Sequence, residues 1–187
     1  SDRLIAIRYS QLRTLASLAE GERRLDELRA MRVEALRFLR LLGAWRPRLI
    51  GSVLTGHIRS GSDIDIHAFC DRAESIAERL GDEGYACDLE RKRVRKHGEE
   101  RVFTHLHVAG RFDVEITVYA SELSNYPFKS SITGKVMERA DEAGLIALLR
   151  EGDKEFDADL ELARAESAEI EPAELFESLL RPLAKVE

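Results

Sequence analysis

The chain has 187 residues, an apolar share of 44% and a formal net charge of −6. Its length allows one domain with a substantial hydrophobic core, and its negative charge excludes a general nucleic-acid coat protein. No apolar run approaches the roughly 18 residues of a membrane span, and the N-terminus lacks a signal-peptide pattern. We therefore expect a cytoplasmic protein without a membrane segment, in which Cys70 and Cys87 are reduced thiols.

The first half of the chain predicts two helices and two strands. From Arg23 to Leu42, apolar residues recur every three or four positions and arginines fall between them, which indicates an amphipathic helix with a basic outer face. Gly43 and Pro47 end this helix. We expect three elements to follow: a short strand over 48–53, a strictly alternating strand over 63–69, and a helix over 72–84 capped by Asp71.

The second half predicts a β-meander and then more helix. Alternating segments over 86–96, 101–110 and 111–119 are joined by a turn at His97-Gly98 and a tight connection at Ala109-Gly110. Helical periodicity returns over 136–152 and continues more weakly into the acidic tail. The sum is an α+β fold with a mixed sheet of about five strands flanked by helices. We expect a helical segment over 1–44, a core over 45–125 and a helical region over 126–187.

Charge is distributed unevenly between the two ends. Residues 1–50 carry 11 arginines against 6 acidic residues, whereas residues 151–187 carry 12 acidic residues against 4 basic ones. The ends are therefore expected to attract each other or to attract different partners, a protein partner or a homodimer among them.

Two aspartates interrupt the strand expected over 63–69. Successive side chains of a strand point to opposite faces, so Asp63 and Asp65 share one face while Ile64 and Ile66 share the other. Two desolvated carboxylates repel each other unless a cation lies between them. Oxygen ligands of this kind suit Mg²⁺ before other metals, which predicts a magnesium site on this face.

A third carboxylate is expected from a neighbouring strand. In the segment 111–119, Asp113 and Glu115 share a face, with Val114 and Ile116 opposite. Either acid can supply the third ligand or a general base. The matching polarity of the two strands predicts that they are neighbours in one sheet with an acidic patch on a common cleft.

Gly51-Ser52 provides a candidate phosphate site at the end of the first strand. Glycine lets the backbone approach a ligand closely, and a turn after a strand exposes N–H groups to phosphate oxygens, with the Ser52 hydroxyl as a further donor. Carboxylates that hold Mg²⁺ opposite amides that hold phosphates form the arrangement that phosphoryl transfer requires.

These motifs together resemble the nucleotidyltransferases related to DNA polymerase beta, over residues 45–120. The resemblance rests on Gly51-Ser52, ten intervening residues, 62-SDID-65 and the later segment 112-FDV-114. It implies the palm fold of that superfamily, with two Mg²⁺ ions, or Mn²⁺ in their place. Asp63 and Asp65 would bind both ions, Asp113 would bind one and activate the attacking hydroxyl, and Glu115 is the reserve for that third position.

Further residues around this motif are substrate-binding candidates. The loop Gly-Ser-x-x-Thr-Gly, which contains Thr55, followed by Ser62-Asp-Ile-Asp, is similar to terminal nucleotidyltransferases that extend RNA ends. Those enzymes carry a second helical domain, for which the roughly 65 residues after Tyr119 leave little room. Arg59 lies within the loop, where it can contact phosphate, and His67 returns to the face of Asp63 and Asp65.

Two other patterns have weaker functional interpretations. His105 and His107 share a strand face at the spacing of metal ligands, but the sequence places no third soft ligand beside them, so an edge of the acidic cleft is preferred to zinc. The stretch 91-RKRVRKH-97 is a candidate polyanion contact, with a solvated hairpin end as the alternative.

The sequence thus predicts an Mg²⁺-dependent nucleotidyltransferase that moves a nucleoside monophosphate from a nucleoside triphosphate to an acceptor hydroxyl and releases pyrophosphate. RNA, a protein and an aminoglycoside-like small molecule all remain open as acceptors. The alternative function is a catalytically silent binding module, such as an antitoxin, that acts through a protein partner.

Overall fold

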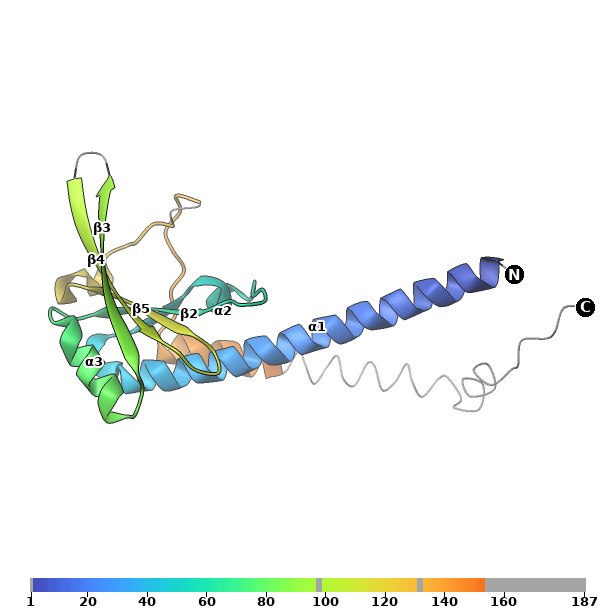
Figure 1. Cartoon of the computed structure of the whole chain (residues 1–187), viewed down its shortest axis with the longest axis horizontal. Coiled ribbons are helices and arrows are strands. Elements are labelled where there is room, and N and C mark those ends of the chain that lie inside the picture. The colour runs from blue at the N-terminus through green and yellow to red at the C-terminus, as the bar shows by residue number, and fades with distance from the viewer. Residues whose placement is uncertain (1, 97–98, 131–132, 154–187) are drawn as a thin grey trace, which may run out of the picture. The chain divides into compact units, whose positions relative to one another are not determined.

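Five strands form one mixed sheet in the order β1-β2-β5-β4-β3 (Figure 1). The central pair, β2 and β5, is parallel, and the other three pairs are antiparallel. The strands are β1 (Arg48–Ile50), β2 (Ile64–Phe69), β3 (Cys87–Lys96), β4 (Glu99–Val108) and β5 (Val114–Tyr119). The predicted α+β class with a mixed five-stranded sheet and flanking helices is confirmed, and β3, β4 and β5 form the predicted meander.

The computed structural model describes residues 2–96, 99–130 and 133–153, and within these the side chains of 12–93, 102–130 and 133–153. The chain divides into a compact unit, Ser1–Leu149, and a second unit, Arg150–Glu187, of which only residues 150–153 are described. The helical tail and the turn at His97-Gly98 that the sequence predicts lie outside the described residues.

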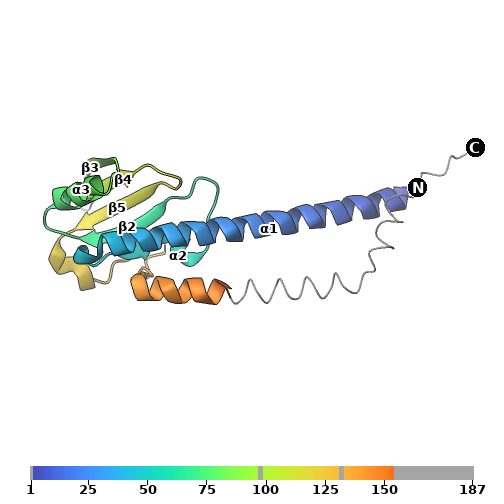
Figure 2. The same cartoon turned by 90° about the horizontal axis from the view of Figure 1, so that it is seen from below.

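Helices cover the sheet on one side. They are α1 (Asp2–Leu41), α2 (Gly51–Thr55) and α3 (Ala73–Asp82), with short 3₁₀ turns at η1 (Gly43–Trp45) and η2 (Ser121–Asn125) and a further helix over 142–153. Only the second part of α1 packs on the strands, and the first part continues past them (Figure 2). In the described part of the chain, no helix is both long and apolar enough to cross a membrane.

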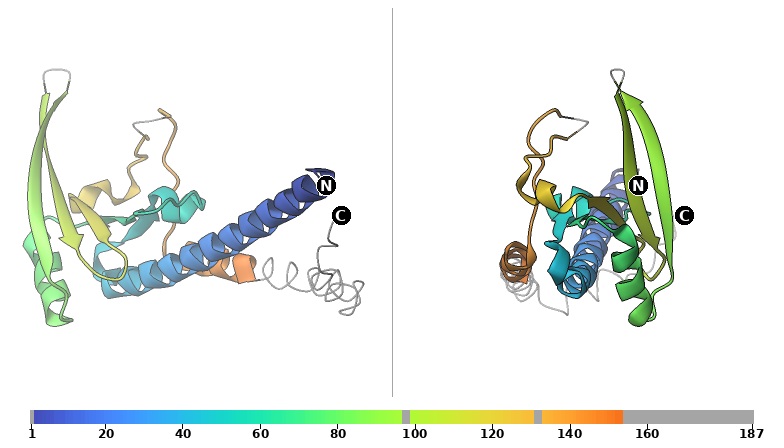
Figure 3. Two further views of the ribbon diagram at one scale, coloured as in Figure 1. Left: turned by 45° about the vertical axis from the view of Figure 1, so that its right-hand side comes forward. Right: turned by 90° about the vertical axis from the view of Figure 1, so that its left-hand side faces the viewer.

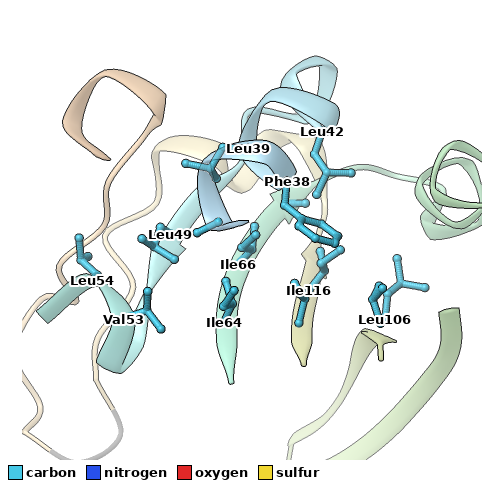
Figure 4. Close-up of a cluster of buried hydrophobic side chains, with 14 of the residues drawn as sticks. Phe38, Leu39, Leu42, Leu49, Val53, Leu54, Ile64, Ile66, Leu106 and Ile116 are labelled. Carbon is cyan, nitrogen blue, oxygen red and sulfur yellow. The ribbon is translucent and has the colours of Figure 1, made fainter. Parts of the chain in front are cut away.

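The hydrophobic core lies between α1 and the sheet. Phe38 and Leu39 near the end of α1, and Leu42 just after it, point at strand residues that alternation places on the same face, as Figure 4 shows. These strand residues include Leu49 on β1, Ile64 and Ile66 on β2, Leu106 on β4 and Ile116 on β5. The opposite sheet face carries the alternate, mostly polar positions of the same strands.

The N-terminal helix begins at Asp2, within the helical segment expected over 1–44, and the periodicity from Arg23 marks only the part that packs on the sheet. Two predicted boundaries are wrong, each for a physical reason. The first strand ends at Ile50 rather than at residue 53, because Gly51 takes a φ of 72° and starts α2. Residues 136–141 are not helical, because the amide and carbonyl of Ala140 bond Leu49 on the edge strand β1.

Asp71 does not cap α3, which is a further correction. Its carboxylate accepts hydrogen bonds from the backbone amide and the hydroxyl of Ser121, at 2.9 and 2.7 Å, and these bonds lower the pKa of Asp71. Arg72 occupies the N-cap position without a side-chain hydrogen bond. The side chain that sequence spacing assigns to a local cap thus joins the end of β2 to the end of β5.

Candidate active site

A row of titratable side chains crosses the sheet face that α1 leaves open. Asp65 on β2 is in register with Glu115 on β5, which is in register with His107 on β4, which is in register with Asp88 on β3. Partners in register point to the same face of a sheet, so these side chains are neighbours. The prediction that β2 and β5 are adjacent and share an acidic face is confirmed.

Asp63 and Asp113 lie beside each other, two residues before Asp65 and Glu115 in their respective segments. Each immediately precedes its strand, and the amide of Ile64 donates to the carbonyl of Asp113 at 2.8 Å, which continues the parallel pairing. A pocket of about 230 Å³ opens here, lined by Asp63, Asp88, His107, Val108, Ala109, Asp113, Val114 and Glu115. Four of its lining side chains are carboxylates.

Gly51 brings the turn after β1 against Asp65. Its φ of 72° lies in the left-handed region that favours glycine. A Cβ atom at this position would overlap the Oδ2 atom of Asp65, so glycine is needed for space as well as for conformation. Gly51 thus brings the backbone into close contact with the Asp65 carboxylate, while its predicted approach to a phosphate stays a prediction.

The surroundings of Asp65 disfavour the ionised form of its carboxyl group. Burial, together with the negative charges of Glu115 and Asp63, raises the pKa of Asp65 to about 6. A divalent cation among these oxygens would remove the repulsion, so the donor set fits Mg²⁺. In the arrangement of the described residues, however, no three His, Cys, Asp or Glu side chains converge as a ready metal cluster. Carboxylates at neighbouring register positions reach a common ion by rotation about their side-chain torsions.

Glu115 is bracketed by the two histidines of β4. Its Oε1 lies 3.1 Å from Nδ1 of His105, and its Oε2 lies 3.6 Å from Nδ1 of His107. His105 also contacts the Thr117 hydroxyl at 3.2 Å, and Nε2 of His107 lies 3.2 Å from Glu90. Of the two histidines expected to edge the acidic cleft, His107 lines the pocket and His105 is not among its lining residues.

The other loop candidates lie away from the pocket lining. The Thr55 hydroxyl points to the carbonyl of Ser52 at 3.5 Å, within α2. Ser62 closes a turn with Arg59, since its hydroxyl accepts the Arg59 amide at 2.8 Å and its own amide donates to the Arg59 carbonyl at 3.0 Å. Their predicted contacts with substrate stay predictions.

His67 lies on the open face but is covered. Its ring packs edge-on against Tyr119 and Phe128, with centroid distances of 4.8 and 5.3 Å, and the residue is 3% exposed. Burial, with smaller electrostatic contributions from Arg139 and His105, lowers the pKa of His67 to about 4, so the His67 ring is neutral at pH 7. Its Nδ1 finds no hydrogen-bond partner among the described residues.

The basic stretch 91–97 is divided by the pleat of β3. Arg91 forms an ion pair with Glu74 of α3, while Lys92 pairs with Glu90. The side chains of 94–97 lie outside those described. The carboxylates beside Arg91 and Lys92 offset the positive charge that would attract a polyanion to these two residues.

Sequence reasoning overlooked two residues that shape this site. Asp88 enters the pocket lining through its register with His107, which the irregular alternation of 86–96 concealed. Arg32 belongs to the supposed outer face of the N-terminal helix, yet it donates from Nε to the Val53 carbonyl and from Nη2 to the Leu54 carbonyl, both at 3.0 Å. It thereby fixes α2, and with it the Gly51-Ser52 turn.

No family model and no curated protein matches the chain. The solved structures that match part of it include two with a TM-score of 0.29 each. One is a cytoplasmic RNA terminal U-transferase, 22% identical, where the match covers 54% of this chain and 28% of the other. The second is Cid1, described for its RNA terminal uridylyl transferase activity, 18% identical, with 55% and 30% covered.

The chain thus spans less than a third of the length of either matched structure. Their TM-scores are too low to carry an inference about activity. What this chain itself has is the mixed five-stranded sheet with flanking helices that the nucleotidyltransferase resemblance implies.

Proposed function

We propose that the protein is an Mg²⁺-dependent nucleotidyltransferase. The supporting observation is the position of Gly51 directly against the Asp65 carboxylate, at one end of an open sheet face that also carries Asp63, Asp113 and Glu115. Phosphate-binding amides and metal-binding carboxylates from separate parts of the sequence thereby lie side by side. Phosphoryl transfer depends mainly on such positioning and on neutralisation of charge.

In this proposal each residue has a defined task. The amides at Gly51-Ser52 and the Ser52 hydroxyl bind the triphosphate, while Asp63, Asp65 and Asp113 would hold two Mg²⁺ ions. When bound, the ions would neutralise the phosphates and polarise the attacking and leaving oxygens. The acceptor hydroxyl gives its proton to Asp113 as its oxygen bonds the α-phosphorus, and the bond to the β-phosphate breaks to release pyrophosphate.

The histidine contacts of Glu115 favour Asp113 as the third acid. His105 and His107 both lie against the Glu115 carboxylate, so a metal ion would compete with them for its oxygens. Asp113 lines the pocket beside Asp63. Glu115 then acts as a fixed negative charge beside the site.

The pocket lining favours a small cationic acceptor over RNA. Asp88 adds a carboxylate beyond those assigned to the metals, and the basic stretch of β3 is partly offset by Glu74 and Glu90. A negative lining repels a phosphate backbone and attracts an amine-rich hydroxyl compound.

We also propose a cytoplasmic location, which the two free thiols, Cys70 and Cys87, support.

The test is transfer of label from each α-labelled nucleoside triphosphate in Mg²⁺ or Mn²⁺, with no acceptor, with total RNA and with an aminoglycoside mixture. Wild type should transfer label and Asp65→Ala should not, while Asp82→Asn, an exposed acid at the end of α3, serves as the matched control. Label on the aminoglycosides supports a small cationic acceptor, and label on RNA identifies a polymer acceptor instead.

Absence of transfer, together with absence of metal-dependent nucleotide binding in calorimetry, would contradict the proposed catalysis. The alternative function drawn from the sequence, a binding module that acts through a protein partner, predicts a complex that is indifferent to the loss of Asp63 and Asp65. That measurement separates the two functions.

A further inference from the structure

The first part of α1 carries large apolar side chains that the compact unit does not cover. Every described residue from 12 to 27 is exposed, and Leu28 is the first buried one. Within this stretch Leu12 is 65% exposed, Leu15 63%, Leu18 61% and Leu25 55%. Figure 3 shows from the side how this part of the helix continues past the sheet.

Leu12, Leu15 and Leu18 form a band on successive turns of the helix surface, and Leu25 lies two turns further along. They follow each other at spacings of three, three and seven residues, and residues three or seven apart are neighbours along a helix. The core-facing residues Met31, Ala35, Phe38 and Leu42 form a separate stripe further along α1 that is already buried. A long apolar band outside the core is typical of a helix that pairs with another helix.

The charge of α1 changes sign along the first part of the helix, so two copies that run in opposite directions have complementary charges. Residues 1–19 contain three arginines and one acid, whereas residues 20–27 contain four acids and two arginines. Both of those arginines, Arg23 and Arg24, already pair with Glu20 on the same helix, at 3.5 Å each. A second copy of α1 that runs in the opposite direction brings the basic segment of each helix to the acidic segment of the other.

We propose that α1 pairs antiparallel with α1 of a second copy of this chain, centred on Leu15. Positions equally far on either side of the centre then meet. Leu12 of one copy lies opposite Leu18 of the other, and Arg8 lies at the level of Glu22. This pairing buries the leucine band and does not depend on nucleotide transfer.

The first test is the mass of the full chain in solution. Light scattering on a sizing column should give twice the chain mass of 21.2 kDa for wild type at micromolar concentration. Leu15→Glu should give a single chain mass, because it places two carboxylates against each other at the centre of the pair. The control Val102→Glu, at a 56% exposed position on β4, should remain dimeric.

The second test fixes direction and register. Arg8→Glu and Glu22→Arg should each shift the equilibrium to monomer, and the double variant should recover the dimer because the exchanged charges face each other again. Equal circular dichroism of all variants shows that the fold is kept.

A monomeric wild type, or a Leu15→Glu variant that stays dimeric, would overturn the proposal. If wild type is monomeric, the leucine band is instead assigned to contact with the acidic tail of the chain or with another protein. Failure of the double variant to recover the dimer would overturn the antiparallel register.

Discussion

Alternate residues of β2 form its two faces, which differ in side-chain chemistry although His67 and Phe69 on the open face are also buried. Ile64 and Ile66 face α1 and are 0% and 1% exposed, whereas Asp65 and His67 face the other way. One face stabilises the fold by removing apolar surface from water. The other holds Asp65 in a surrounding that raises its pKa to about 6. Alternation along one strand therefore separates stability from chemistry at a distance of one residue.

A substitution in β2 should therefore affect mainly the fold when the residue faces α1, and mainly the proposed chemistry when it faces the open side of the sheet. Four variants test the comparison, given in order of their expected effect on the free energy of unfolding.

Ile66→Ala should have the largest effect on stability. It removes three carbon atoms from a fully buried site between β2 and α1, and such truncations cost about 2–5 kcal/mol. Val102→Ala, at an exposed site on β4, should stay within about 0.5 kcal/mol of wild type. Urea unfolding followed by circular dichroism measures both, and equal losses would contradict the assignment of the core to the α1 face.

Gly51→Ala should damage both stability and nucleotide binding. A left-handed backbone costs a non-glycine residue about 1–2 kcal/mol, and the new Cβ atom displaces the Asp65 carboxylate. Gly61→Ala is the matched control, because Gly61 has a φ of 78° but nothing within 4 Å of its Cβ position. Both variants should lose similar stability, and only Gly51→Ala should lose nucleotide affinity in calorimetry. Similar affinities would mean that the contact with Asp65 has no role in binding.

Arg32→Ala should cost about 1 kcal/mol of stability, because two carbonyls at the end of α2 lose their donor. In the proposed enzyme it should raise KM for the nucleotide more than it lowers kcat, since it loosens the turn and leaves the carboxylates in place. Arg32→Lys should recover part of the affinity. Arg37→Ala, which removes a surface ion pair with Glu34, should leave both the stability and the KM for the nucleotide unchanged.

Asp65→Asn stands last in this order because its effect on stability has the opposite sign. The folded protein raises the pKa of Asp65 from 3.8 to about 6, so the ionised carboxylate opposes folding at neutral pH. In chelator at pH 7 the asparagine variant should therefore unfold at slightly higher temperature, and this gain should shrink as the pH falls from about 6 toward 3.8. Label transfer should be lost. A variant less stable than wild type at pH 7 would show that Asp65 is stabilised by contacts.

Much of the fold was predictable because strand alternation is a local property. The segment 63–69 alternates strictly in sequence, and its helix-facing positions Ile64, Ile66 and Ala68 are buried, although His67 and Phe69 on the other face are buried as well. Helix and strand limits were less predictable where a tertiary contact decides them. Residues 136–141 have helical periodicity, but Ala140 gains two hydrogen bonds to Leu49 by remaining extended. Asp71 likewise stands at a cap position and binds Ser121 fifty residues away.

The candidate site divides in the same way. Spacing alone placed Asp63 and Asp65 on one face and paired them with Asp113 and Glu115, because both pairs obey the two-residue period of a strand. Spacing gave no reason to include Asp88 or Arg32. Their roles follow from the antiparallel register of β3 with β4 and from the packing of α1 on α2.

The sequence by itself determined which face each strand residue takes, the glycine at the turn and the shared acidic face of two strands. These are consequences of backbone geometry over a few residues. Only the tertiary structure decided that the neighbouring strands β2 and β5 run parallel, that Gly51 touches Asp65, and that two histidines bracket Glu115. Such contacts join residues far apart in the chain, and their pairing is chosen by the packing of the whole sheet on α1.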